Sequence, residues 1–141
     1  MRFFFIVTLS AILAACSPEQ ASEPNTLQSL RGQWVVINYW AKWCKPCIRE
    51  IPELNRLNSE HSDITVLGVN YDGASGEELA TQEATLGVEF QTLPADPAAE
   101  LGTPRPVVLP TTLIFDPEGQ LRATLVGPQT EESLLAATVG R

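Results

Sequence analysis

The chain has 141 residues, 44% of them hydrophobic and 18% charged, and this favours one globular domain with its own core over two domains. The formal net charge of -8 excludes a nucleic-acid-binding surface, because phosphate binding requires a basic patch and the nine Lys and Arg residues are scattered along the sequence.

The first predicted element is an export signal over residues 1–15, M-R-F-F-F-I-V-T-L-S-A-I-L-A-A. Arg2 supplies a positive charge, and the apolar stretch that follows is too short to span a bilayer comfortably. A buried N-terminal element is the alternative, but the polar segment after residue 15 offers nothing to pack over the apolar stretch.

Cys16 closes the segment L-A-A-C, which resembles the lipobox of bacterial lipoproteins. The resemblance implies that Cys16 is lipidated and becomes the new N-terminus. If Cys16 is not lipidated, it is an unpaired cysteine in an oxidising compartment, where it could form intermolecular disulfides. Because Ser17 rather than Asp follows, the resemblance favours the outer over the inner membrane of a bacterial envelope, with the protein facing the periplasm.

Residues 16–29 contain two prolines and several small polar residues, and this composition predicts a flexible tether. The folded part is expected to begin at about Leu27 or Leu30, and the domain is assigned to residues 30–141. Its first strand is predicted at Trp34–Trp40, which is apolar enough on both faces to be central in a covered sheet.

A helix should begin near the two cysteines that follow, because apolar residues recur every three positions at Ile48, Ile51, Leu54 and Leu57. Asp63–Asn70 is predicted as a second strand, and strand, helix, strand in this spacing makes a right-handed parallel unit.

Ser75–Leu86 is predicted as a second helix, with Ser75 as its cap and Gly87 as its stop. Residues 88–109 carry four prolines and are expected to be irregular. Thr111–Phe115 and Leu121–Val126 predict a β-hairpin, and Thr130–Val139 a closing helix.

Cys44 and Cys47 form a C-x-x-C at the junction of the first strand and helix. Unpaired backbone N–H groups and the positive end of the helix dipole favour an anion there, so Cys44 is the candidate nucleophilic thiolate. Lys45 adds a neighbouring cation, and Pro46 fits an early helical position. Cys47, one turn further, should be more shielded and resolve the mixed disulfide that Cys44 forms.

Three other interpretations of the cysteine pair compete with redox chemistry. A structural disulfide with so short a loop would constrain the unfolded chain little. Zinc would need two more ligands, and the chain offers only Cys16 and His61, which is expected to be a solvated turn residue. Covalent haem attachment needs C-x-x-C-H, but Ile48 occupies the His position.

Two segments together carry a family resemblance. W-A-K-W-C-K-P-C, with Pro52 five residues later, and L-P-T-T-L-I-F-D-P-E-G from Leu109 resemble thioredoxin-fold proteins, in particular the membrane-tethered TlpA/ResA-like disulfide reductases of bacterial envelopes. The resemblance implies an α/β thioredoxin-like fold, in which helices flank a central mixed β-sheet and a β-hairpin and helix end the chain. It covers about residues 27–139.

The resemblance also assigns roles around the cysteines. Pro110 would be cis and lie against the pair, and the backbone of Leu109 would bind an extended segment of the substrate protein. Trp43, Lys45, Pro46 and Pro110 are the predicted supporting residues. No metal or organic cofactor is implied. A trans proline at the start of a strand is the alternative for Pro110.

Two positions depart from the pattern of thioredoxins. Asn38 stands where many of them carry a buried Asp that helps to move the proton of the second cysteine, so the sequence assigns no carboxylate to that task. Lys45 stands where some relatives place Glu, and a cation there favours the thiolate and hence a stronger oxidant. The family resemblance nevertheless favours a reductant.

The predicted function is an envelope thiol:disulfide oxidoreductase that exchanges disulfides with other proteins, supplied by a membrane electron donor. We expect a monomer. One alternative is a peroxide-reducing enzyme of the same fold, although such enzymes usually carry Thr where this chain has Ala41. The other is a redox-inert or copper-handling lipoprotein, in which both sulfurs would bind Cu(I).

Overall fold

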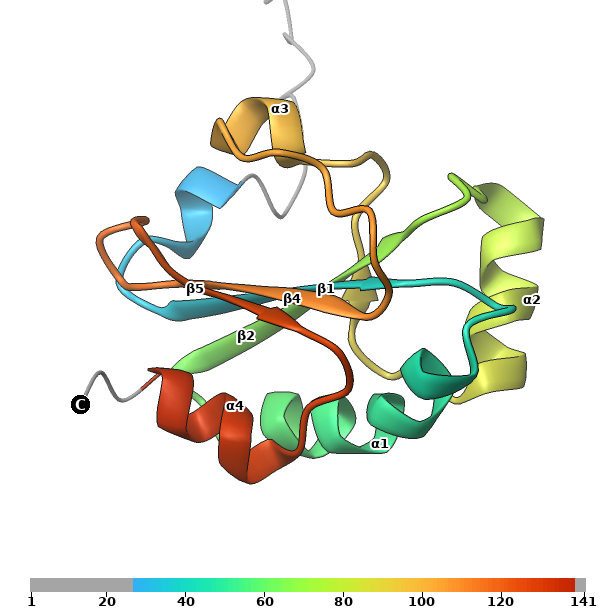
Figure 1. Cartoon of the computed structure of the whole chain (residues 1–141), viewed down its shortest axis with the longest axis horizontal. Helices are drawn as coiled ribbons and strands as arrows, with labels where there is room; N and C mark the ends of the chain where they lie inside the picture. Colours follow the sequence, from blue (N-terminus) through green and yellow to red (C-terminus); the bar gives the residue numbers. More distant parts are fainter. Residues whose placement is uncertain (1–26, 139–141) are drawn as a thin grey trace, which may run out of the picture.

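Five strands form one mixed β-sheet in the order β3-β2-β1-β4-β5 (Figure 1). The computed structural model describes residues 27–138, so the predicted export signal, the predicted lipid site at Cys16 and most of the predicted tether lie outside the described residues. The strands are β1 (Trp34–Trp40), β2 (Ile64–Asn70), β3 (Gln91–Thr92), β4 (Thr111–Phe115) and β5 (Leu121–Val126). β1 pairs in parallel with β2 and antiparallel with β4, which confirms the predicted mixed sheet.

Helices cover both faces of this sheet. They are the 3-10 helix η1 (Leu27–Leu30) and the α-helices α1 (Lys45–Glu60), α2 (Gly76–Leu86), α3 (Ala98–Leu101) and α4 (Glu131–Thr138). In Figure 1, α1 and α4 lie together below the sheet, η1 and α3 lie above it, and α2 stands at one end.

Alternation along β1 divides the core into two clusters. Val36 and Trp40 face α1 and belong to the cluster that also contains both cysteines of the C-x-x-C. Val35, Ile37 and Tyr39 face the other side and belong to a second cluster, with η1 and α3 packed against it. Because successive side chains of a strand point to opposite faces, a continuous apolar run is what a strand covered on both faces requires.

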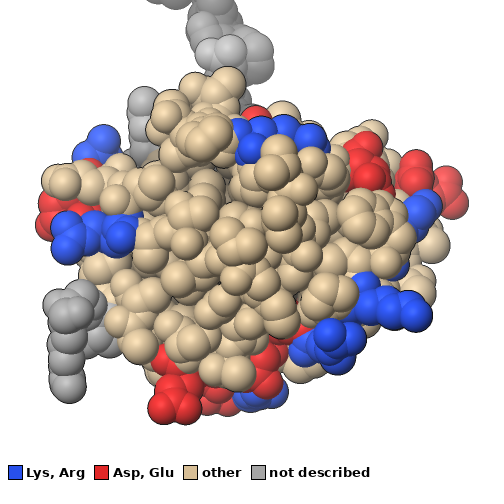
Figure 2. Space-filling view, in the orientation of Figure 1, with Lys and Arg blue, Asp and Glu red and all other residues tan. Residues whose placement is uncertain are grey.

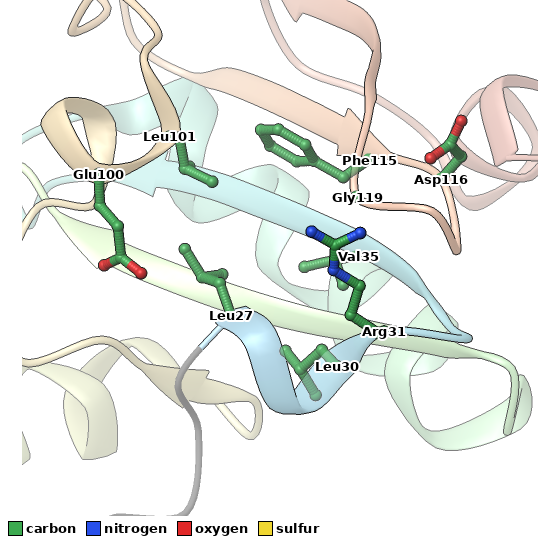
Figure 3. A pocket seen from close by; sticks show the side chains of 9 residues that line it. All are labelled: Leu27, Leu30, Arg31, Val35, Glu100, Leu101, Phe115, Asp116 and Gly119. Carbon is green, nitrogen blue, oxygen red and sulfur yellow. The ribbon is translucent and has the colours of Figure 1, made fainter.

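The second cluster borders a cavity of about 240 Å³. Figure 3 shows the apolar side chains of Leu27, Leu101 and Phe115 among those that line it, together with the charged side chains of Arg31 and Glu100. Because these apolar residues belong to the cluster that lacks the cysteines, the cavity lies on the sheet face away from the C-x-x-C pair.

Most predicted elements are present within a residue or two of their expected ends. The closing helix begins at Glu131. α2 ends at Leu86 and is capped by Gly87, whose φ of 70° is left-handed, as the predicted stop requires. Ser75 is the N-cap of α2, but its side chain makes no capping hydrogen bond.

One segment differs from expectation. The region 88–109, expected to be irregular, contains the short strand β3 and the one-turn helix α3. β3 forms because Gln91 and Thr92 pair with Leu67 and Gly68 of β2. Regular structure starts at Leu27, the earlier of the two expected starts, and Leu27 and Leu30 pack against the second core cluster. Among residues 27–138, no helix is both long and apolar enough to cross a bilayer.

Candidate active site

Cys44 and Cys47 are joined by a disulfide at the start of α1, with their Cα atoms 5.3 Å apart. Cys44 is the N-cap of α1 and Pro46 occupies its first turn. The backbone N–H of Cys44 donates to the carbonyl of Ala41 over 3.0 Å, which turns the chain from β1 into α1. The junction therefore has the strand-to-helix arrangement that the sequence predicts.

The two sulfurs differ in environment. Both are buried in the oxidised protein, and Cys44, 4% exposed, is only slightly more accessible than Cys47, which is 1% exposed. The backbone N–H of Cys47 donates to Cys44 Sγ over 3.3 Å. A helix N-terminus that already donates to this sulfur is suited to stabilise a negative charge on it after reduction.

The predicted supporting residues surround the pair on its solvent side. Trp43 is 59% exposed, and its indole N–H donates to the Asp72 carboxylate over 2.8 Å. Lys45 is the first residue of α1 and its side chain is exposed. Trp43 is thus a large apolar surface immediately before the disulfide, held in orientation by one charge-assisted hydrogen bond.

Leu109 and Pro110 are joined by a cis peptide bond, as predicted. Leu109 is partly buried against both core clusters, one of which contains the cysteines. The carbonyl of Pro110 accepts from the N–H of Gly127 over 2.9 Å, and Thr111 Oγ1 donates to the carbonyl of Val108 over 2.8 Å. These bonds fix both sides of the bend, whereas the backbone of Leu109 makes no hydrogen bond to any other residue between 27 and 138.

Glu50 is the residue that sequence reasoning missed. It lies on α1, three residues after Cys47, and is only 1% exposed. Its carboxylate accepts from Asn38 Nδ2 over 3.1 Å and from the backbone N–H of Gln129 over 3.0 Å. Burial raises the pKa of Glu50 to about 7, and the hydrogen bonds from Gln129 and Asn38 oppose that shift. A carboxyl with this pKa can take up or release a proton near neutral pH.

The position of Glu50 in the helical repeat could have indicated its burial from the sequence. Positions 47, 50, 51, 54 and 57 all lie on the buried side of α1, and the apolar stripe already marked three of them as buried. A charged residue at such a position is rarely buried without a partner, so its place in the stripe predicts a paired carboxylate inside the protein.

A second polar network holds the loop that leads to Leu109. Arg105 Nε lies 2.7 Å from Asp96 Oδ2, and its guanidinium stacks 3.9 Å from the centroid of the Tyr71 ring. Tyr39 donates its hydroxyl to Asp96 Oδ1 over 2.8 Å, and burial together with this bond raises the pKa of Tyr39 above its usual range. These contacts attach residues 96–105 to Tyr39 on β1 and to Tyr71, the residue that follows β2.

Metal ions in proteins are commonly bound by clusters of His, Cys, Asp and Glu side chains. Residues 27–138 contain no group of three or more His, Cys, Asp or Glu side chains placed to hold a metal ion. His61 is not the solvated turn residue that we expected, because its side chain is partly buried and its Nε2 lies 3.2 Å from Glu131 Oε1 between α1 and α4. Ala41 is fully buried, and no hydroxyl stands at this position.

The fold and site are those of the thioredoxin-like thiol:disulfide oxidoreductases: a mixed sheet, a C-x-x-C disulfide at a helix N-terminus and a cis-proline. The chain belongs to the AhpC/TSA family, whose sequence profile matches residues 10–124.

Two curated relatives and one solved structure illustrate the similarity. The chain is 31% identical over 117 residues to thioredoxin-like protein YneN of Bacillus subtilis (strain 168), covering 81% of this chain and 68% of YneN. It is 30% identical over 110 residues to thiol-disulfide oxidoreductase ResA of Bacillus anthracis, covering 77% of this chain but only 63% of ResA. A secreted thiol-disulfide isomerase from Corynebacterium glutamicum superposes with a TM-score of 0.69 at 27% identity, covering 79% of this chain and 72% of the other.

Proposed function

We propose that this chain is a lipid-anchored thiol:disulfide oxidoreductase of the bacterial envelope, which reduces disulfides of other proteins through Cys44 and Cys47. The observation that carries the proposal is the Cys44–Cys47 disulfide at the N-terminus of α1, with Cys44 the more exposed partner. The names of the relatives, thiol-disulfide oxidoreductase and thiol-disulfide isomerase, support the same reaction class.

The reaction transfers two electrons from the reduced pair to a client disulfide. The Cys44 thiolate attacks one client sulfur, a mixed disulfide forms, and the other client sulfur leaves as a thiolate that takes a proton from solvent. Cys47 then loses its proton and attacks Cys44 Sγ, which releases the second client thiol and forms the Cys44–Cys47 disulfide. An electron donor at the membrane must afterwards reduce this disulfide for the next cycle.

Glu50 is the proposed acceptor of the Cys47 proton. Both residues are almost fully buried on the same side of α1, one turn apart, where solvent cannot serve as the base. A carboxyl with a pKa of about 7 can accept a proton from the thiol and release it again without a large energetic cost in either direction. Asn38 and the Gln129 N–H orient the carboxylate for this task.

The client backbone is proposed to bind beside the cis-proline. Leu109 lies between the two core clusters, and its peptide groups are not used by the fold of residues 27–138. An extended client segment could therefore pair with this backbone as an added strand does, with its cysteine directed at Cys44.

A trapping experiment tests the proposal. In the Cys47→Ser variant, Cys44 can attack a client but the mixed disulfide cannot be resolved, so covalent complexes should accumulate in envelope extracts and be released by dithiothreitol. The Cys44→Ser variant is the matched control and should trap nothing. Equal trapping by both variants, or none by either together with no reduction of insulin by the wild type, would contradict the proposed reaction.

The direction of electron flow is open to a direct measurement. Equilibration with glutathione buffers should give a potential closer to the thioredoxin value, about -270 mV, than to the oxidising end of the fold, about -120 mV. A potential near the oxidising end would make the protein an oxidant. It would indicate that the positive charge of Lys45 has a larger effect than the features the chain shares with family members that act as reductants.

The envelope location rests on the sequence before residue 27 and on a relative named as secreted. Wild-type protein should sediment with outer membranes and carry a lipid on Cys16, whereas the Cys16→Ala variant should not. If the lipidated protein is found instead in the inner-membrane fraction, the proposed lipid anchor stands and only the proposed choice of membrane is wrong.

A further inference from the structure

The surface around the cysteine pair carries three exposed basic side chains. Lys42, Lys45 and Arg49 are all exposed, and they precede, separate and follow the two cysteines. In Figure 2 basic side chains gather at the right of the molecule, beside the N-terminal part of α1. We call Lys42, Lys45 and Arg49 the basic collar.

Two members of the collar differ from the other basic residues of the described chain. Arg56, Arg105 and Arg122 each lie within ion-pair distance of a carboxylate, and Arg31 donates to the carbonyl of Glu118. By contrast, Lys45 and Arg49 have no ion-pair or hydrogen-bond partner among residues 27–138. Lys42 is paired with Glu78 over 3.5 Å, but both side chains are more than half exposed. The charges of Lys45 and Arg49 are therefore available to a partner, and the exposed charge of Lys42 lies beside them.

Helix stability does not account for the collar. Acidic side chains near a helix N-terminus are favourable, and α2 begins with Glu77 and Glu78 while α4 begins with Glu131 and Glu132. α1 has no acidic residue in its first turn and carries Lys45 there instead, with Arg49 one turn further on the same face. Like charges so spaced on a helix repel one another, so the arrangement costs stability and calls for another cause.

The charge of the collar is opposite to that of the whole chain, which is -8. The nearby acidic groups already have partners or lie to one side: Asp72 is bound to the Trp43 indole and Glu50 is buried. Glu77 and Glu78 of α2 lie beside Lys42, and Glu53 is bound to Arg56. Between Lys42 and Cys44, the exposed ring of Trp43 offers an apolar contact. A partner that fits this surface has carboxylates around its reactive sulfur and avoids the acidic remainder of the domain.

We infer that the basic collar of Lys42, Lys45 and Arg49 is a docking surface for disulfide-bonded client proteins whose reactive cysteine is flanked by Asp and Glu. This rests on the proposed function and adds a client class to it. The collar selects acidic clients by raising their rate of encounter with Cys44, and an effect of this kind weakens as salt screens the charges.

The test uses the full-length protein, reduced and freed of reductant, with three peptides of equal length. Each peptide carries one cysteine in a mixed disulfide with 2-mercaptoethanol, flanked by Glu, by Ser or by Lys residues. The rate constant for loss of each mixed disulfide is measured at low and high salt. At about 10 mM ionic strength the Glu peptide should react about tenfold faster than the Ser peptide, and the Lys peptide more slowly, whereas all ratios should approach one at about 1 M.

The Lys42→Gln/Arg49→Gln double variant should lower the Glu-to-Ser ratio at low salt to about two or less, since only Lys45 then remains of the collar. Arg122→Gln removes an exposed Arg at the far end of the β4–β5 hairpin and should leave the ratio unchanged. Equal rates for the three peptides, a faster Lys peptide, or an equal loss of the ratio in the Arg122→Gln control would overturn the inference. If the wild type reduces none of the peptides, the proposed function itself fails.

Discussion

The side-chain amide of Asn38 on β1 donates to the carboxylate of Glu50 on α1 over 3.1 Å, inside the protein and one helical turn from Cys47. The same Asn38 nitrogen donates to Thr112 Oγ1 over 2.9 Å, so the contact joins β1, β4 and α1. Asn38 therefore does not replace a buried acid; it orients one that α1 supplies. The carboxyl group that we propose as the proton acceptor of Cys47 therefore lies on the helix, whereas the sequence offered none on the strand.

The buried carboxyl of Glu50 makes stability depend on pH in an unusual direction. Because burial raises its pKa from 4.5 to about 7, the folded protein keeps a proton that the unfolded chain has already released. Protonated Glu50 therefore stabilises the folded state, relative to the protein at high pH, by on the order of 3 kcal/mol. This stabilisation is fully present below pH 4.5 and is lost as the pH rises through about 7. Gln does not titrate, so only the wild type loses this stabilisation as the pH rises. The free energy of unfolding of Glu50→Gln minus that of the wild type should therefore increase by about 3 kcal/mol between pH 4 and about 8, measured by urea denaturation.

Glu53 on the same helix is the matched control. Its pKa is lowered by the backbone N–H of Glu131 and by Arg56, so Glu53→Gln should change relative stability only below pH 4.5 and in the opposite sense. Glu50→Gln should also shift the pH profile of disulfide release, because its side chain no longer accepts the proton of Cys47. Parallel stability curves for wild type and Glu50→Gln would contradict the assigned pKa.

Gly68 of β2 lies tightly against side chains of the neighbouring strands β1 and β3. A Cβ at this position would lie 2.8 Å from Trp40 Nε1 and 3.0 Å from Thr92 Oγ1, and Trp40 is fully buried. Neither polar atom has a hydrogen-bond partner among residues 27–138, so the cost of Gly68→Ala is one of packing. The variant should lose about 1 to 3 kcal/mol in free energy of unfolding, with no change in the denaturant slope.

The Gly68→Ala/Thr92→Ala double variant provides a check on this cause. Removing Thr92 Oγ1 relieves one of the close contacts, so the double variant should be more stable than the sum of the single effects predicts. Strict additivity, or a Gly68→Ala variant as stable as wild type, would show that the sheet has room at this position.

Arg105 holds the loop before the cis-proline through several contacts at once. Its guanidinium binds Asp96, the carbonyl of Tyr71 and the face of the Tyr71 ring, a planar arrangement that Lys cannot reproduce. Arg105→Lys should therefore cost about 1 kcal/mol, a value kept small because the side chain is half exposed. Amide hydrogen exchange across residues 96–108 should become faster.

Arg122→Lys is the corresponding control. Arg122 has a similar exposure, but its nearest carboxylate oxygen is 3.8 Å away on Asp116, so little should change. If both variants lost the same stability, or if exchange in the 96–108 loop did not change with Arg105→Lys, the Arg105 contacts would not be what holds this loop.

The sequence predicts well where local patterns and backbone rules suffice. The apolar run of β1, the stripe on α1 and the glycine stop of α2 each reflect one periodicity or one turn residue, and each element was found close to its expected bounds. The cysteine pair was placed at its junction for the same reason.

What the sequence could not predict depends on contacts between distant residues. β3 is only two residues long, and it exists because Gln91 and Thr92 meet β2, not because of their own propensity. The bond from Tyr39 to Asp96 joins side chains from separate elements, and the burial of Glu50 depends on Asn38 and Gln129 arriving from two others. Such long-range partners leave no local pattern.

Selective alkylation of the reduced full-length protein tests the central claim most directly. At neutral pH, iodoacetamide followed by peptide mass spectrometry should label Cys44 at least about tenfold faster than an unstructured cysteine peptide, because the N-terminus of α1 favours its thiolate, while Cys47 is labelled far more slowly. Equal labelling of the two residues, or a Cys44 no faster than the peptide, would contradict an account in which Cys44 attacks and Cys47 resolves.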